Sequence, residues 1–253
     1  MLDLGTGTGI WAIDFARRNP TSQVIGVDIS VLQPEFVSKN LQFQIDDVEE
    51  EWTWRQDFDL IHCRMLDGCF KDMKSIFRKA FKYVTRHISN CSTDAVYYNR
   101  QLRPGGYFEV GDVLYIPQCD DGTLLPNSPI RQWGHLLAEA ANNMGRPINL
   151  ASQYRDMLID VGFEDVCKKS VTWPTNPWAR QHQYRRLGAW TQLTLCSELE
   201  ALSMALFTHG LGWKRREILA LCGRVRKEME NPEIHAYFCF VTCYGRKPVA
   251  TVL

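Results

Sequence analysis

The sequence lacks an excess of charge of either sign, a long apolar run and a secretion signal. Its 29 basic residues equal its 29 acidic ones, so the 253-residue chain has no general attraction to nucleic acid or to an anionic membrane. No apolar run approaches the roughly 20 residues that span a bilayer. Asp3 and Asp14 interrupt the apolar residues of the N-terminus, which has no basic segment. We therefore expect no direct nucleic-acid partner and no membrane partner, and a location in the cytoplasm or nucleus.

Cysteines at disulfide or metal-binding spacing are also missing. The nine cysteines are an odd number, are scattered along the chain and include no C-x-x-C pair. The closest two, Cys239 and Cys243, lie in an alternating segment that predicts a strand with both thiols packed on one face. This usage is typical of a reducing compartment and predicts neither a disulfide framework nor a metal site.

Short apolar runs alternate with helical periods through the first half of the chain. Runs that are β-branched or alternating predict four strands, at 24–30, 41–47, 58–64 and 105–112. Apolar residues that recur on one face predict helices at 10–18 and 74–83. Strand, helix and strand at this spacing predict an α/β fold, in which right-handed βαβ units form a parallel sheet with helices on both faces.

The second half is mainly helical. Its patterns predict helices at 129–144, 151–161 and about 179–230, the last with a break near 209–213, and strands at 162–173 and 231–248. Because the final strand can return to the sheet, we expect one domain over 1–253 with a helical insertion before its last strand. Residues 1–115 would form the cofactor-binding half, and residues 116–253 the substrate-side and helical half.

Three glycines follow the first predicted strand in the segment LDLGTGTG. Gly5, Gly7 and Gly9 can adopt positive φ and let a ligand approach the backbone closely. The dinucleotide fingerprint G-x-G-x-x-G would need a glycine where Ile10 stands, which argues against a nucleotide-dependent oxidoreductase. The loop therefore predicts a ligand site of another kind.

Acidic residues end the next two predicted strands. Asp28 ends the second strand, where a carboxylate can accept both ribose hydroxyls of an adenosine. Asp46 and Asp47 end the third, and either suits the amino group of adenine. Together with the glycine loop, these acids predict a cofactor that contains adenosine.

These residues belong to motifs that resemble a known family. Five segments resemble, in order, the motifs of class I S-adenosylmethionine-dependent methyltransferases. They are LDLGTGTG, GVDIS, DDVEEEW, FDLIHCRML and LRPGGYFEV. Three longer segments resemble fungal LaeA-like proteins, a family that includes regulators of secondary metabolism and uncharacterised methyltransferases. They are LDLGTGTGIWAIDFA, LEALSMALFTHGLGW and NPEIHAYFCFVTCYGRKP. The resemblance covers almost the whole chain and implies a Rossmann-like sheet with an antiparallel last strand and S-adenosyl-L-methionine as cofactor.

The resemblance implies cofactor contacts at eight positions, which are Asp3, Gly5, Gly7, Gly9, Asp28, Asp47, Val48 and His62. The first four would line the methionine and sugar portion, Asp28 would hold the ribose, and the next two would contact adenine. His62, at the end of the fourth strand, would face the methyl group. It is the predicted catalytic residue, because an imidazole titrates near neutrality and can act as a general base. A packed structural histidine is the alternative.

Further residues are candidates for the wall of an acceptor pocket. They are Arg64, Glu109, Asp112 and five tryptophans at 52, 54, 173, 178 and 190. The alternative for the charged residues is a surface or structural role. For the tryptophans it is core packing.

The resemblance implies a methyltransferase that acts on a small-molecule or protein acceptor and is linked to secondary metabolism. Methyl transfer from a sulfonium is an in-line displacement in which the protein mainly positions and desolvates the nucleophile, so no fixed catalytic constellation is required. The alternative is a non-catalytic, cofactor-binding subunit of a complex that controls transcription, with a regulatory protein partner. Detection of transferred methyl groups separates the two.

Two irregularities interrupt the pattern. Residues 84–101 are polar and lack an apolar period, and their removal joins a helix directly to LRPGG. Because valine codons begin GT and CAG encodes glutamine, we hypothesise a translated, unspliced intron, with a surface-loop insertion as the alternative. Only four residues precede Gly5, fewer than the five or six of an average strand. We therefore expect an N-terminally truncated domain that binds S-adenosylmethionine weakly.

Overall fold

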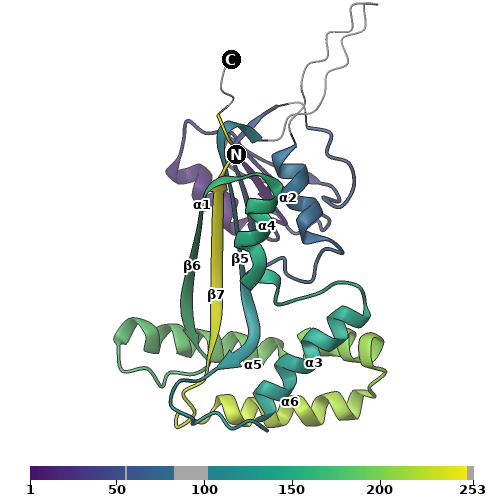
Figure 1. The fold of residues 1–253 in the computed structure, drawn as a ribbon, viewed down its shortest axis with the longest axis vertical. Coiled ribbons are helices and arrows are strands. Elements are labelled where there is room, and N and C mark those ends of the chain that lie inside the picture. The colour runs from purple at the N-terminus through teal and green to yellow at the C-terminus, as the bar shows by residue number, and fades with distance from the viewer. Residues whose placement is uncertain (55, 83–101, 250–253) are drawn as a thin grey trace, which may run out of the picture.

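A computed structural model describes residues 1–54, 56–82 and 102–249 (Figure 1). The predicted insertion at 84–101 lies outside the described residues. In chain order the elements are β1 (Leu2–Leu4), α1 (Ile10–Arg18), β2 (Val24–Asp28), β3 (Leu41–Ile45), β4 (Phe58–Arg64), α2 (Met73–Phe81), β5 (Leu102–Gln118), α3 (Pro129–Asn143), the 3-10 helix η1 (Leu150–Gln153), α4 (Tyr154–Val161), β6 (Glu164–Pro174), α5 (His182–Leu211), α6 (Arg215–Met229) and β7 (Tyr237–Arg246).

The seven strands form one sheet in the order β3-β2-β1-β4-β5-β7-β6. The pairs from β3 to β5 are parallel, and β7 runs antiparallel to both β5 and β6. The α/β fold class and the antiparallel last strand are thus confirmed. The strand order reverses between β1 and β4, and open α/β sheets bind ligands beyond the carboxyl ends of the strands at such a point.

Helices cover both faces of the sheet, as predicted. On one face, α2 and α4 bury their apolar sides against β1, β4 and β5, in a core that includes Leu2, Ile61, Phe77 and Phe108. On the other face, Ala12 and Ala16 of α1 pack against the edge formed by β2 and β3. Asp72 is the N-cap of helix α2, and its carboxylate accepts the backbone N–H of Ser75 at 3.1 Å.

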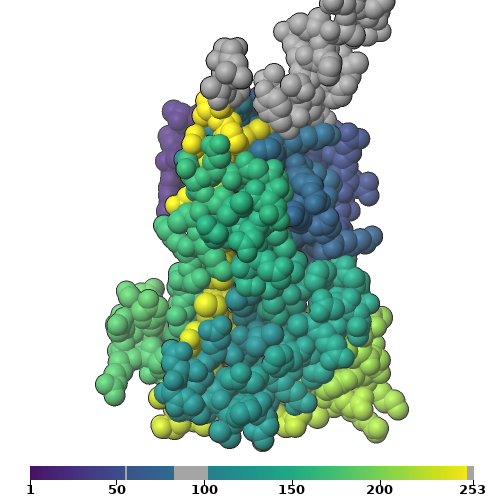
Figure 2. All heavy atoms as spheres, viewed as in Figure 1, coloured from purple at the N-terminus to yellow at the C-terminus, as the bar shows by residue number. Residues whose placement is uncertain are grey.

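A second core lies at one end of the sheet, where β5 and β7 extend beyond the parallel strands. There α3, α5 and α6 pack around the ends of the long strands, while the N-terminus and the C-terminal end of β7 lie at the opposite end (Figure 1). In chain order, helices α5 and α6 follow β6 and precede β7, which confirms the helical insertion before the last strand. The green start of α5 projects from the body of the molecule (Figure 2).

Strand β5 is much longer than the predicted strand 105–112, since it continues to Gln118. The added residues pair with the start of β7, from Leu114 opposite Cys239 to Gln118 opposite Tyr237. The extension carries the sheet into the helical layer and provides one wall of the cavity described below. Among the described residues, no helix is both long and apolar enough to cross a membrane.

Candidate functional site

The glycine loop connects β1 to α1 at the carboxyl edge of the sheet. Gly5, Gly7 and Gly9 have φ values of 61°, 57° and 78°, a region that side chains disfavour. A Cβ on Gly5 would lie 2.4 Å from Leu66 Cδ2, and one on Gly9 would lie 2.3 Å from Phe43 Cζ. A Cβ on Gly7 would meet no atom within 4 Å. Gly5 and Gly9 are therefore required by protein packing, whereas Gly7 leaves its backbone open to a ligand.

Asp28, the last residue of β2, is held against this open stretch of backbone. Its Oδ2 accepts the N–H of Gly7 at 2.8 Å, and its Oδ1 accepts the N–H of Ser30 at 2.9 Å. Gln33 closes the arrangement by donating from Nε2 to the carbonyl of Gly7 at 2.6 Å. Each carboxylate oxygen can accept more than one hydrogen bond, so Asp28 retains capacity for the two hydroxyls of a ribose. The predicted pairing of glycine loop and acid is present in the fold.

The turn after β3 lies beside Asp28. The N–H of Asp46 donates to the backbone carbonyl of Asp28 at 3.1 Å, and the exposed Asp47 accepts the N–H of Glu49 at 2.8 Å. Val48 differs from its neighbours, because its side chain is buried in the core, and its carbonyl accepts Nζ of Lys79 from α2 at 3.1 Å. The structure therefore brings Asp47 to the same edge as Asp28 and directs the Val48 side chain inward.

Asp3 and His62 form a buried pair beneath the loop. They are register partners on β1 and β4, and His62 Nδ1 lies 2.7 Å from Asp3 Oδ1. The other oxygen of Asp3 accepts the hydroxyl of Thr6 at 2.6 Å, so Asp3 supports the loop from below. The His62 ring stacks on Trp11 with centroids 3.6 Å apart, and its Nε2 lies 3.8 Å from Glu109.

The predicted strand 58–64 is confirmed as β4, and His62 lies near its end, followed only by Cys63 and Arg64. Both side chains of the Asp3–His62 pair are only 5% exposed. Side chains of successive strand residues point to opposite faces, and His62 points to the face that Trp11 covers. Its role as a base stays a prediction, and this burial favours the structural alternative.

A buried acid network that the sequence only hinted at follows β4. Asp112 was a pocket candidate, yet it is 1% exposed and its Oδ1 accepts the N–H groups of Leu66 and Asp67, at 2.7 and 3.1 Å. Its Oδ2 accepts the hydroxyl of Tyr154 at 2.7 Å. Asp67 in turn accepts the N–H of Asn149. The network joins the loop that contacts Gly5 to the segment after α3.

Burial and mutual repulsion perturb both acids. Loss of solvent and, to a smaller extent, the nearby Asp112 carboxylate together raise the pKa of Asp67 to about 7. Loss of solvent also raises the pKa of Asp112 to about 6, against the opposing effect of the hydrogen bond from Tyr154. A carboxylate that titrates near neutrality at a sheet edge is suited to accept a proton.

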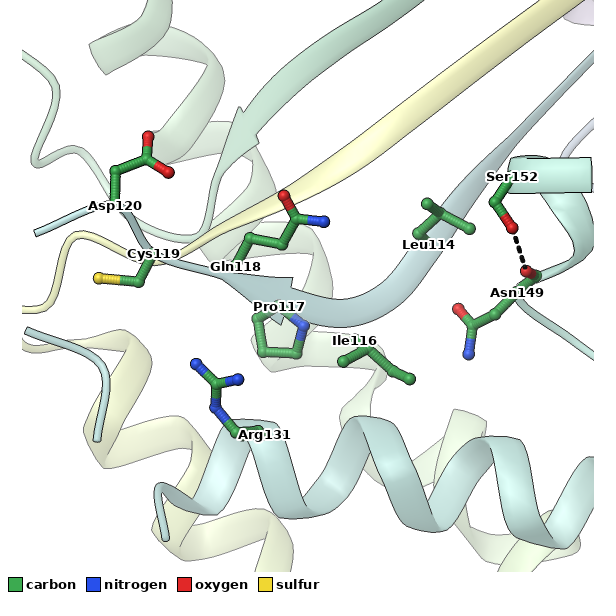
Figure 3. A pocket seen from close by; sticks show the side chains of 9 residues that line it. All are labelled: Leu114, Ile116, Pro117, Gln118, Cys119, Asp120, Arg131, Asn149 and Ser152. Carbon is green, nitrogen blue, oxygen red and sulfur yellow. Dashed lines mark hydrogen bonds between the residues drawn. The ribbon is translucent and has the colours of Figure 1, made fainter. Parts of the chain in front are cut away.

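A cavity of about 560 Å³ lies between the second half of β5 and α3 (Figure 3). Its lining residues are Leu114, Ile116, Pro117, Gln118, Cys119, Asp120, Arg131, Asn149 and Ser152. Figure 3 shows the guanidinium of Arg131 at one end and the amide of Asn149 at the other, with Ile116 and Pro117 between them. No sequence motif pointed to this cavity, because its walls come from segments that are far apart in the chain.

The tryptophans mostly follow the alternative interpretation. Trp52 and Trp54 are buried in the core beneath the sheet, Trp173 stacks on Phe240, and Trp190 is exposed on α5. In the part of the chain that the structure describes, no three His, Cys, Asp or Glu side chains converge as a metal site would require. The eight cysteines described there are free thiols, including buried Cys243 on β7.

Comparison with known sequences gives a consistent result. A family model described as a methyltransferase domain matches residues 1–168. Methyltransferase pytC of Aspergillus terreus is 31% identical over 249 residues, which cover 98% of this chain and 71% of that protein. The secondary metabolism regulator LAE1 of Cochliobolus heterostrophus is 34% identical over 252 residues, covering 98% and 76%. The regulator laeA of Aspergillus flavus is 36% identical over 252 residues, covering 98% and 63%.

Comparison with solved structures supports the fold. Phosphoethanolamine N-methyltransferase 2 of Haemonchus contortus, in complex with phosphomonomethylethanolamine and S-adenosylhomocysteine, matches with a TM-score of 0.53 and 15% identity over 98% of this chain and 49% of that one. The [4+2]-cyclase SpnF matches with a TM-score of 0.52 and 19% identity, over 98% and 75%. One of these neighbours is named as a methyltransferase and the other as a cyclase, so the likeness concerns the fold alone.

Proposed function

The chain belongs to the methyltransferase-domain family, and we propose that it transfers a methyl group from S-adenosylmethionine to an acceptor. The observation that carries the proposal is the geometry of Gly7 and Asp28. Gly7 offers backbone with no atom within 4 Å of where its Cβ would stand, and the Asp28 carboxylate lies within 2.8 Å of its N–H. The relatives named as regulators and as a methyltransferase place the chain in a fungal branch associated with secondary metabolism.

The residues at the sheet edge fit this cofactor. S-adenosylmethionine supplies an electrophilic methyl group on a sulfonium. We assign the open backbone at Gly7 to its amino-acid and sugar portion, Asp28 to the ribose hydroxyls, and Asp47 to adenine. Gly5 and Gly9 hold the loop in shape through Leu66 and Phe43, and the buried Asp3 supports it through Thr6.

A base would accept the proton that the acceptor loses as its bond to the methyl carbon forms. His62 is the base that the sequence predicts, but its ring is enclosed by Asp3 and Trp11. Asp67 is better placed, because it follows Leu66, which packs on Gly5, and its carboxyl titrates at a pKa of about 7. Asp67 would then take the proton, and turnover would rise with pH to a plateau above about 7.

A second function is favoured by the relatives that are named as regulators of secondary metabolism. In that case the chain would bind the cofactor as part of a regulatory complex and would transfer no methyl group. The partner in such a complex would be another protein, and the acceptor site would have no catalytic use.

Radiolabelled methyl transfer to a fungal extract tests the proposal. The wild-type protein and Asp28→Ala are incubated with S-[methyl-³H]adenosylmethionine, and the small-molecule and protein fractions are counted separately. We expect label in one fraction with the wild type and at least a tenfold loss with the variant. Asp14→Ala, which removes an exposed acid from α1, is the matched control and should behave as the wild type. Cofactor binding without any transferred label would support the regulatory function instead.

A further inference from the structure

Three buried side-chain atoms have no hydrogen-bond partner among the described residues, and all three lie in one region. They are Asp67 Oδ1, Arg131 Nε and Asn149 Nδ2. Arg131 and Asn149 line the cavity beside β5. The backbone N–H of Asn149 donates a hydrogen bond to Oδ2 of Asp67. Buried polar atoms are almost always paired in folded proteins, so unpaired ones call for an explanation such as a missing ligand. Two of the three, Arg131 Nε and Asn149 Nδ2, belong to residues that line this cavity, which indicates a polar ligand there.

Arg131 offers a positive charge to this ligand. Two acids of the surrounding segments accept hydrogen bonds from other groups: Asp120, which also lines the cavity, accepts the hydroxyl of Tyr237 at 2.8 Å, and Glu228 accepts the hydroxyl of Ser128 and the N–H of Ile130 at 2.7 and 2.8 Å. Within the described residues no ion pair involves the guanidinium. A partly buried guanidinium of this kind favours an anionic oxygen, to which it can donate two parallel hydrogen bonds.

Asn149 offers a second donor whose orientation is fixed. Its Oδ1 accepts the backbone N–H of Tyr115 at 2.6 Å, and a backbone N–H can only donate, so the oxygen and nitrogen of the amide are assigned unambiguously. The Nδ2 group is therefore left with two unused hydrogens on the cavity side. Between this amide and Arg131 the wall is apolar, formed by Leu114, Ile116 and Pro117.

We propose that this cavity binds the methyl acceptor, and that the acceptor is a small, mainly apolar molecule that carries a carboxylate. Arg131 and Asn149 hold the carboxylate, and the apolar wall holds the carbon skeleton. The assignment rests on the proposed function, and it selects the small-molecule acceptor over the protein acceptor. A volume of about 560 Å³ is in the range of small-molecule sites and has no room for a folded partner.

The position of the cavity agrees with this role. It opens beside the carboxyl-terminal half of β5, and β5 pairs in parallel with β4. The backbone N–H of Asn149, in the wall of the cavity, donates a hydrogen bond to Asp67 in the loop after β4. The neighbouring residue of that loop, Leu66, is the one that packs on Gly5 of the glycine loop. Acceptor cavity, Asp67 and cofactor loop are thus successive parts of the same sheet edge.

Binding of two matched probes tests the proposal. The probes are 1-naphthoate and the neutral 1-naphthalenemethanol, titrated calorimetrically into the protein saturated with S-adenosylhomocysteine. We expect the carboxylate to bind at least tenfold more tightly than the alcohol. Arg131→Gln should remove this preference, and Arg216→Gln, an exposed arginine on α6, should keep it. Equal affinities for the two probes, or an unaltered preference in Arg131→Gln, would overturn the proposal.

A second variant guards against misfolding. Asn149→Asp keeps the shape and the acceptor for Tyr115 but replaces the Nδ2 donor by a carboxylate oxygen, so it should also abolish the preference for 1-naphthoate. S-adenosylhomocysteine affinity is measured in the same samples. A wild-type protein that binds S-adenosylhomocysteine but shows no preference for 1-naphthoate refutes the acceptor site and leaves the proposed function intact. A protein that binds no S-adenosylhomocysteine refutes the proposed function, while the probe titrations alone still decide whether the cavity is a carboxylate site.

Discussion

Replacement of Gly7 by alanine separates the cost of an unfavourable backbone from the loss of a ligand site. Gly7 has a φ of 57°, and a Cβ there would meet no protein atom within 4 Å. The only cost to the folded protein is the left-handed conformation of alanine, about 1 to 2 kcal/mol. For a chain of this size, a loss of 1 kcal/mol lowers the melting temperature by about 2 to 4 °C. The variant should therefore remain folded.

Its cofactor affinity should fall much further. The new methyl group would occupy the space that we assign to the cofactor, and overpacking of this kind costs about 1 to 3 kcal/mol. Since each 1.4 kcal/mol is tenfold in Kd, we expect a loss of roughly 10- to 100-fold. Calorimetric titration with S-adenosylhomocysteine measures this, alongside thermal unfolding of the same sample.

Gly212→Ala provides the control for backbone strain. Gly212 caps the end of α5 with a φ of 73°, and a Cβ there would also meet nothing within 4 Å. This variant should lose the same stability as Gly7→Ala and bind the cofactor like the wild type. If both variants bind equally well, the reasoning about the open face of Gly7 is refuted.

Two further predictions concern the buried acids. Asp67 has its pKa raised from 3.8 to about 7, so the unfolded chain ionises first, and the free energy of unfolding should fall by about 2 to 4 kcal/mol as the pH rises from 4 to above 7. Asp67→Asn should reduce this slope in urea unfolding, leaving the smaller part that Asp112 contributes, and be the more stable protein at pH 8; a less stable variant at that pH contradicts the assignment. His62→Leu should leave Asp3 Oδ1 buried without its partner and lower the free energy of unfolding by about 1 to 3 kcal/mol. An unaltered melting temperature would show that the pair has no structural role.

The glycine loop could be predicted because its signal is local. Three glycines at alternate positions and an acid at the end of the next strand are visible in one stretch of about 25 residues, and the structure places Gly7 and Asp28 in hydrogen-bond contact. The helix at 10–18 was predicted to the residue for the same reason. Local patterns of this kind depend on backbone geometry that the sequence specifies directly.

The depth of a side chain and the length of β5 could not be predicted in this way. His62 was expected to face the cofactor because nothing in the sequence shows that Trp11 of α1 covers its ring. The predicted strand stopped at Asp112, whereas β5 continues to Gln118. In the fold, that acid is buried through hydrogen bonds with Leu66 and Tyr154, which come from distant segments.

The cavity beside β5 shows the same limit most clearly. Arg131 and Asn149 belong to no motif, and they acquire a shared role only because α3 and the segment after it fold onto the end of β5. The sequence therefore offered candidates for the cofactor side of the site and none for this cavity. The weak cofactor binding that we expect from the sequence stays a prediction, which calorimetric titration with S-adenosylmethionine would test.

The central claim is that the chain binds S-adenosylmethionine through the glycine loop and Asp28. Calorimetric titration of wild type and Asp28→Ala with S-adenosylmethionine, and of wild type with NAD, tests it most directly. We predict one-to-one binding of S-adenosylmethionine to the wild type, at least tenfold weaker binding to the variant, and no binding of NAD. Binding of NAD, or equal affinity of the wild type and Asp28→Ala for S-adenosylmethionine, would contradict it.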